Sequence, residues 1–182
     1  MKTIKGCLIT LSATIVICGL LFWYYKRNTI ERFETLNSQV TQQWEKTAKL
    51  VTAKNNELKL EPNISDSLKF FLQEFEQKCN LKFCDSNFIN IEYAINRLAL
   101  KDSLEQKYIN ELNLNSTIYD SYVRNYNTER SVFPTFLILR KTGLKNHYKY
   151  FGIEYGVQNE SPKQKRKKTH EWMKKIEDSI LK

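Results

Sequence analysis

The amino-acid sequence predicts an all-α protein, in which an N-terminal transmembrane helix precedes an antiparallel four-helix bundle with a basic C-terminal tail. Gly and Pro are rare, at 5 and 3 of 182 residues, which disfavours β-sandwiches and barrels with many turns. An uncharged run lies near the N-terminus, and behind it apolar residues recur at steps of three and four. We therefore divide the chain into a short flank (1–5), an anchor (6–25), one helical domain (26–160) and a tail (161–182).

The predicted anchor, residues 6–25, is a stretch of twenty residues without a charge. A helix of that length rises about 1.5 Å per residue and crosses roughly 30 Å of hydrocarbon. Lys2 and Lys5 precede the run, and Lys26 and Arg27 follow it. Because the basic residues on the two sides nearly balance, the side of the membrane on which the domain lies stays open.

Two other interpretations of this segment are less favourable. A cleavable signal peptide has small residues before its cleavage point, whereas residues 22–25 are Phe-Trp-Tyr-Tyr. A lipoprotein also requires small residues before its cysteine, and here Ile17 precedes Cys18. We therefore expect an uncleaved signal anchor with a single span.

Four helices are expected in the domain. The first continues from the anchor without Gly or Pro after residue 19, until Glu-Pro-Asn at residues 61–63 ends it. Ser65 or Asp66 can cap the second helix, and Asp102 can cap a long fourth helix that reaches about Arg130. Each helix is expected to turn one stripe towards the core. In chain order the four stripes are Phe33, Leu36, Val40, Trp44, Thr47 or Ala48, and Val51; Leu68, Phe71 or Leu72, Phe75 and Cys79; Phe88, Ile91, Ile95 and Leu98; and Leu104, Tyr108, Leu112, Asn115, Tyr119, Tyr122 and Tyr126.

The cysteines and histidines do not form a recognisable metal site. Cys79 and Cys84 make a C-x4-C pair without a second pair, and His147 and His170 are far away along the chain. We therefore expect neither a metal nor another cofactor. A local disulfide between the two cysteines stays open, because it depends on the compartment.

The tail carries more than half of the net charge of +9. Residues 162–182 hold eight Lys and Arg against three Asp and Glu, a net charge of +5. Such a cluster favours anionic lipid headgroups over nucleic acid, which we do not expect as a partner. The alternative is a tail that packs weakly on the bundle. The residues predicted to face lipid are Lys165, Arg166, Lys167, Lys168, Trp172, Lys174 and Lys175.

Two stretches of the chain resemble motifs of the LemA family of bacterial membrane proteins. One is Val40-x-x-x-Trp44 on the first helix, and the other is a Tyr- and Asn-rich run followed by Phe-Pro, a Gly and Tyr-Phe. Asp120 stands where the family motif has Asn, and the charged tail has no counterpart in the family. The matching residues are Val40, Trp44, Tyr119, Tyr122, Val123, Tyr126, Asn127, Phe133, Pro134, Gly143, Tyr150 and Phe151.

The resemblance implies an antiparallel bundle at the bacterial cytoplasmic membrane without an established enzymatic activity. Physical chemistry gives the motif residues a structural role, because Tyr119, Tyr122 and Tyr126 share one helical face and can fill a core. Asn127 and Asp120 can bond backbone groups at the turn towards Pro134. The alternative is a polar pocket for a ligand.

No catalytic constellation is visible in the sequence. Asp120 and Glu129 are nine residues apart and do not share a helical face closely, and His147 has no Ser or Cys motif beside it. We therefore expect a non-catalytic protein, anchored in the membrane, that serves as an interaction or scaffold protein of an envelope complex. One alternative is binding or remodelling of anionic lipid by the tail, and another is an enzyme with an unrecognised site.

Overall fold

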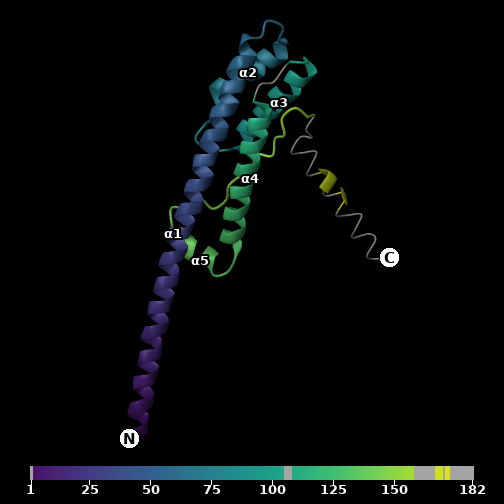
Figure 1. The fold of residues 1–182 in the computed structure, drawn as a ribbon. Coiled ribbons are helices and arrows are strands. Elements are labelled where there is room, and N and C mark those ends of the chain that lie inside the picture. The colour runs from purple at the N-terminus through teal and green to yellow at the C-terminus, as the bar shows by residue number, and fades with distance from the viewer. Residues whose placement is uncertain (1, 105–107, 158–166, 170, 173–182) are drawn as a thin grey trace, which may run out of the picture. The chain divides into compact units, whose positions relative to one another are not determined.

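The chain folds into helices joined by short loops and one longer coil (Figure 1). This computed structural model describes residues 2–104, 108–157, 167–169 and 171–172; of residues 2–10 it describes only the helical backbone. The described residues form no strand, so the all-α prediction is confirmed. The helices are α1 (Lys2–Leu60), α2 (Asp66–Lys78), α3 (Ser86–Lys101), α4 (Ile109–Ser131) and α5 (Thr135–Leu139).

Two compact units make up the structure. Unit 1 comprises Met1–Gln39 and Arg124–Tyr148, and unit 2 comprises Val40–Val123 and Lys149–Lys182. Each unit contains a part of α1 and a part of α4. We describe the two units separately.

Helix α1 is continuous, as the lack of Gly and Pro after Gly19 predicts. Its stripe is buried at steps of three and four, at Phe33, Val40, Trp44, Ala48, Val51 and Leu58. The Glu61 N–H donates to the carbonyl of Leu58, and Pro62 then ends the helix because it has no N–H to donate.

The prediction of a transmembrane helix is wrong for the part of the chain that the structure describes. No helix there combines the length and the apolar character that a membrane crossing requires. The uncharged run with described side chains covers residues 11–25, about 22 Å of helix against roughly 30 Å of hydrocarbon, and Lys26 follows it. The single-pass span and the signal anchor predicted at residues 6–25 are corrected accordingly.

Side-chain caps define α2 and α3. Ser65 caps α2, as predicted, because its side chain accepts a hydrogen bond from the Leu68 N–H. The Asp85 side chain caps α3 by accepting from the Phe88 N–H. Asp102 does not begin the fourth helix, contrary to the prediction. Its N–H donates to the Leu98 carbonyl and so ends α3, while its carboxylate accepts from the Ser65 N–H at 3.1 Å.

Helix α4 therefore starts later than predicted. Ser103 and Tyr108 have left-handed φ angles of 54° and 69°, which no helix interior accommodates, and α4 begins at Ile109. Leu104 and Tyr108 consequently precede the helix in which we expected them. The end of α4 at Ser131 lies one residue beyond the predicted Arg130.

The core of unit 2 surrounds Trp44 of α1. Its ring centroid lies 4.9 Å from that of Phe88 on α3, 5.2 Å from that of Tyr119 on α4 and 5.7 Å from that of Phe151. The indole N–H donates to the Leu81 carbonyl at 3.0 Å, so the ring is satisfied as well as buried.

Contacts along the helices of unit 2 give their directions. Glu57 of α1 accepts from Tyr108 just before α4, whereas Gln43 contacts Asn115 further along α4, so the two helices are antiparallel. Helices α2 and α3 are antiparallel too, because the start of α2 contacts the end of α3 and Phe75 packs on Phe88. Four helices therefore enclose one core.

Unit 1 has a smaller aromatic core on the parts of α1 and α4 that belong to it. The Tyr126 ring lies 5.5 Å from that of Phe33 and 4.9 Å from that of Tyr148. Helix α5, which sequence reasoning missed, adds Ile138 and Leu139 to the buried residues. The guanidinium of Arg130 holds the loop behind α5 by donating to the Leu139 carbonyl and to Asn146 Oδ1.

Candidate functional site

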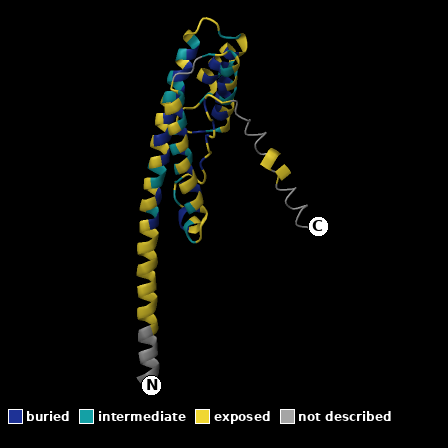
Figure 2. Cartoon of the chain, turned by 45° about the vertical axis from the view of Figure 1, so that its right-hand side comes forward, coloured by how far each residue is buried: buried dark blue, intermediate teal, exposed yellow. Residues whose placement is uncertain are grey.

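Among the residues that the structure describes, a long run of exposed apolar side chains lies in the N-terminal part of α1. From residue 11 to residue 25, which we call the apolar segment, every residue is exposed (Figure 2). Isolated apolar side chains on a surface are ordinary, but a contiguous run of large ones marks a binding surface. Its large apolar members are Leu11, Ile15, Val16, Ile17, Leu20, Leu21, Phe22, Trp23, Tyr24 and Tyr25, all between 43% and 68% exposed.

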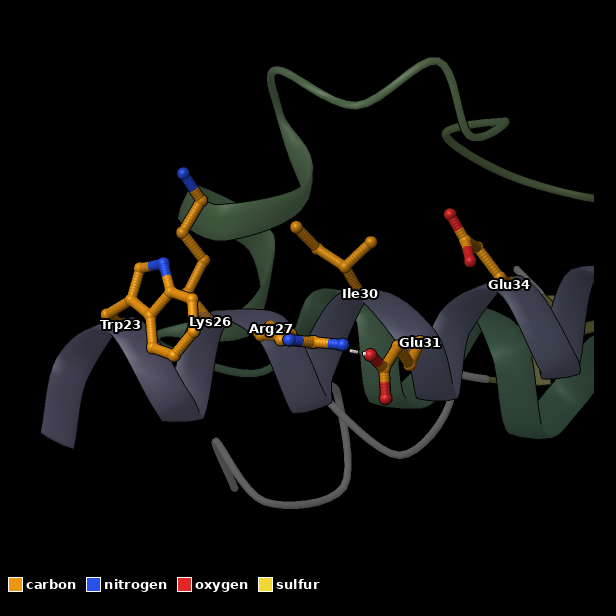
Figure 3. A pocket seen from close by; sticks show the side chains of 6 residues that line it. All are labelled: Trp23, Lys26, Arg27, Ile30, Glu31 and Glu34. Carbon is orange, nitrogen blue, oxygen red and sulfur yellow. Dashed lines mark hydrogen bonds and ion pairs between the residues drawn. The ribbon is translucent and has the colours of Figure 1, made fainter. Parts of the chain in front are cut away.

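A hollow of about 300 Å³ lies at the end of the apolar segment (Figure 3). All of its lining side chains come from α1, namely Trp23, Lys26, Arg27, Ile30, Glu31 and Glu34. Arg27 donates to Glu31 at 2.9 Å, and its guanidinium carbon lies 6.0 Å from the centre of the Trp23 ring. A hollow lined by one helix is a surface feature that suits a side chain of another protein, and it cannot enclose a substrate.

A buried polar cluster lies in the core of unit 2, at positions that sequence reasoning missed. Glu92 accepts from Tyr155 and from Asn55 at 2.9 Å each, and it forms an ion pair with Lys54. Burial lowers the pKa of Lys54, although Glu92 acts in the opposite direction. Burial, followed by Glu92, raises the pKa of Tyr155 well above its ordinary value.

This cluster is closed to substrates. The side chains of Lys54 and Glu92 are 1% and 0% exposed. Tyr155, which contacts both of them, is itself only 1% exposed. The titratable groups are therefore paired with one another inside the core. A signal for the cluster does exist in the sequence, because Lys54 continues the spacing of Trp44, Ala48 and Val51 along the apolar stripe.

The residues of the LemA-like motif lie in three environments. Val40, Trp44, Tyr119, Val123, Tyr126, Asn127 and Phe151 are buried, Tyr122 and Pro134 are half-buried, and Phe133, Gly143 and Tyr150 are exposed. The hydroxyl groups of Tyr119 and Tyr126 donate to the carbonyls of Lys149 and Lys145. The motif thus contributes to two cores and does not converge on one pocket.

Asp120 and Asn127 bond main-chain groups, but farther along the chain than the turn before Pro134 where we expected them. Asp120 accepts from the N–H groups of Phe151 and Gly152, and Asn127 exchanges two hydrogen bonds with the main chain of Tyr148. The two bonds of Asn127 satisfy main-chain groups of the buried Tyr148 that would otherwise be left unpaired. Asp120 and Glu129, the two carboxylates that a catalytic pair would require, have different partners. Asp120 accepts from the main chain, whereas Glu129 forms an ion pair with Arg32 at 2.7 Å.

The cysteines and histidines form no site among the residues that the structure describes. Cys79 and Cys84 are not joined by a disulfide, and burial raises the pKa of Cys79 to about 12. His147 is exposed, whereas His170 lies outside the described residues. No cluster of His, Cys, Asp and Glu within the described ranges could hold a metal ion.

The tail is described only in part. Lys167, Lys168 and Trp172 belong to short helical stretches and are exposed, with Trp172 at 62%. Lys167 lies 3.8 Å from Glu171. The other predicted lipid-facing residues, Lys165, Arg166, Lys174 and Lys175, lie outside the described residues.

Comparisons with protein-family models, with curated proteins and with solved structures found no match to this chain.

Proposed function

We propose that this chain is a non-catalytic interaction protein that serves as a scaffold in a complex of the bacterial cell envelope. The exposed apolar segment of α1 carries the proposal. It displays ten large apolar side chains that the described part of the chain leaves exposed, and burial of apolar area is the dominant driving force of protein association. The bacterial envelope as its location rests on the resemblance to the LemA family.

The chemistry of the segment defines the partner. Fifteen helical residues present about 22 Å of apolar surface, which suits an apolar helix or groove of another protein. Lys26 and Arg27 follow the segment directly and favour acidic residues at the edge of the partner surface. The closed arrangement of Lys54, Glu92 and Tyr155 supports a non-catalytic role, because these groups already satisfy one another.

Photo-crosslinking in the native bacterium tests this function. A benzophenone amino acid replaces Trp23, which is 58% exposed in the apolar segment, or Phe70 of α2, which is 59% exposed and serves as the matched control. We expect a discrete protein adduct at position 23 and none at position 70. Adducts with lipid alone at position 23, or the same adducts at both positions, would contradict a protein partner.

A second candidate function is binding of anionic lipid by the tail. It is favoured by the exposed Lys167, Lys168 and Trp172, since basic side chains attract anionic headgroups and a Trp ring inserts at the interface. The test compares the full chain with a chain that lacks residues 162–182 on vesicles with and without phosphatidylserine. The truncation should abolish binding to the anionic vesicles, and added salt should weaken binding of the full chain. Unchanged binding after truncation would exclude the tail.

A further inference from the structure

The turn from α4 into α5 displays large apolar side chains on the surface of unit 1. We call residues 132–137 the corner, which lies at the end of α4 (Figure 1). The Phe133 and Phe136 rings lie 6.3 Å apart between their centroids, so they belong to one surface. Four large apolar side chains among six consecutive residues mark a binding surface. Their exposed fractions are 55% for Val132, 72% for Phe133, 46% for Phe136 and 50% for Leu137.

The core of unit 1 holds the corner in this position. Ile138 and Leu139, which follow it directly, are buried. The Phe136 N–H donates to the Val132 carbonyl at 3.2 Å, and the guanidinium of Arg130 donates to the Leu139 carbonyl at 3.3 Å. One side of α5 is therefore packed in the core while the corner stays outside, so the exposure of the corner is a property of the fold.

The charges that accompany the corner are basic. Residues 130–148 contain no Asp or Glu, and Arg140 and Lys141 follow α5 directly and are exposed. Over the residues of unit 1 with described side chains, eight Lys and Arg stand against three Glu, a net charge of +5. One of these acids, Glu129, is paired with Arg32 at 2.7 Å. The corner therefore combines exposed apolar area with a positive surrounding, which complements an anionic partner.

We propose that the corner and the basic residues behind it dock on an anionic lipid surface. The apolar side chains enter the layer below the headgroups, while Arg140 and Lys141 bind the headgroups themselves. A fluid lipid surface adapts to an outward-facing apolar turn, whereas a protein would have to offer a groove of matching shape. This site belongs to unit 1, so it is distinct from the basic tail and does not rest on the partner proposed for the apolar segment.

Photo-crosslinking of the purified full-length chain to vesicles tests the lipid contact. A benzophenone amino acid replaces Phe133 of the corner or Phe70 of α2, which is 59% exposed in unit 2 and serves as the matched control. The vesicles consist of phosphatidylcholine alone or of phosphatidylcholine mixed with phosphatidylserine. We expect a phospholipid adduct at position 133 on the mixed vesicles and none at position 70. Added salt should reduce this adduct, because it screens the attraction between basic residues and headgroups.

Charge variants separate local recognition from the overall charge of the chain. Arg140→Gln combined with Lys141→Gln should lower the adduct at position 133 roughly thirtyfold when the vesicles are not in excess, about fivefold for each basic residue near an anionic surface. Lys82→Gln combined with Lys101→Gln removes the same charge from exposed positions of unit 2 and should leave the adduct unchanged. Circular dichroism verifies that all variants keep their helices.

Several results would overturn the proposal. The lipid adduct could be missing at position 133, equal at positions 133 and 70, or equally strong on phosphatidylcholine alone. It could also resist the pair of Arg140→Gln and Lys141→Gln but vanish when residues 162–182 are removed, in which case the tail binds the lipid. In the native bacterium, a discrete protein adduct at position 133 without a lipid adduct would assign the corner to a protein partner. The adduct at position 23 tests the proposed function separately.

Discussion

The two ends of helix α1 differ in how they use apolar residues. From residue 40 onwards, apolar side chains recur at steps of three and four and are buried, with Trp44 only 2% exposed. From residue 11 to residue 25 they occupy nearly every position, and Trp23 is 58% exposed. A stripe offers one face to the helices of its own chain, whereas a segment that is apolar on all sides must be covered from outside by other apolar surface. Periodicity, more than apolar content, therefore determines which part of a helix its own fold buries.

The largest effect on stability is expected when Trp44 and Trp23, one at each end of α1, are replaced in turn. Trp44→Ala removes a ring that packs on three others and should lower the free energy of unfolding by about 3–5 kcal/mol. Trp23→Ala should change it by less than about 0.5 kcal/mol, because the ring is exposed. Urea unfolding followed by circular dichroism measures both. Similar losses in the two variants would show that the apolar segment is packed in the isolated chain.

Replacing two lysines of α1, one buried and one exposed, should give a difference in stability of similar size. Lys54→Met leaves the buried carboxylate of Glu92 without its charge partner and should reduce the free energy of unfolding by about 3–5 kcal/mol. Lys26→Met, at an exposed position, should alter it by less than about 0.5 kcal/mol. Adding Glu92→Leu to Lys54→Met should restore part of the loss, because an apolar pair replaces an unpaired charge. No recovery in the double variant would mean that Glu92 is needed for more than the ion pair.

Alkaline pH should weaken the core of unit 1 through Tyr148. Burial raises its pKa from 10.0 to about 12, so the folded chain keeps a proton that the unfolded chain releases above pH 10. This contribution to stability is complete below pH 10 and is lost as the pH rises towards 12. Thermal unfolding between pH 9 and pH 12 should show a smaller decrease in Tm for Tyr148→Phe than for the unchanged chain. An identical decrease in both would contradict the assignment to Tyr148.

The smallest effect on stability is expected for two threonines of α1, each of which donates to the carbonyl four residues earlier. Thr47 is buried and donates to the Gln43 carbonyl at 3.0 Å, whereas Thr35 is exposed and donates to the Glu31 carbonyl at 3.1 Å. Thr47→Val should lower the free energy of unfolding by about 1 kcal/mol, because a buried carbonyl loses a donor. Thr35→Val should change it by less than about 0.5 kcal/mol, since water replaces the hydroxyl. Equal changes would show that burial does not matter at these sites.

Local signals predicted most of the helical framework. The stripe of α1, the Ser65 cap and the end of α4 near Arg130 depend on residues close together in the sequence, and the structure has all three. The prediction that Asp102 begins the fourth helix is wrong, because a polar residue between two helical patterns can begin one helix or end another. Contacts decide between these roles, and here Asp102 bonds Leu98 and Ser65, which belong to earlier parts of the chain.

The sequence by itself determined the all-α class, the continuous first helix and most of the positions that face a core, because each follows from spacing within a few turns. Only the tertiary structure decided that Lys54, Glu92 and Tyr155 meet in unit 2. It also decided that Asn113 and Asp120 bond the main chain of Tyr155 and Phe151. These pairs are separated by 31 to 63 positions along the chain. No local periodicity encodes such separations, since they arise when packing brings distant polar groups together and burial requires each to find a partner.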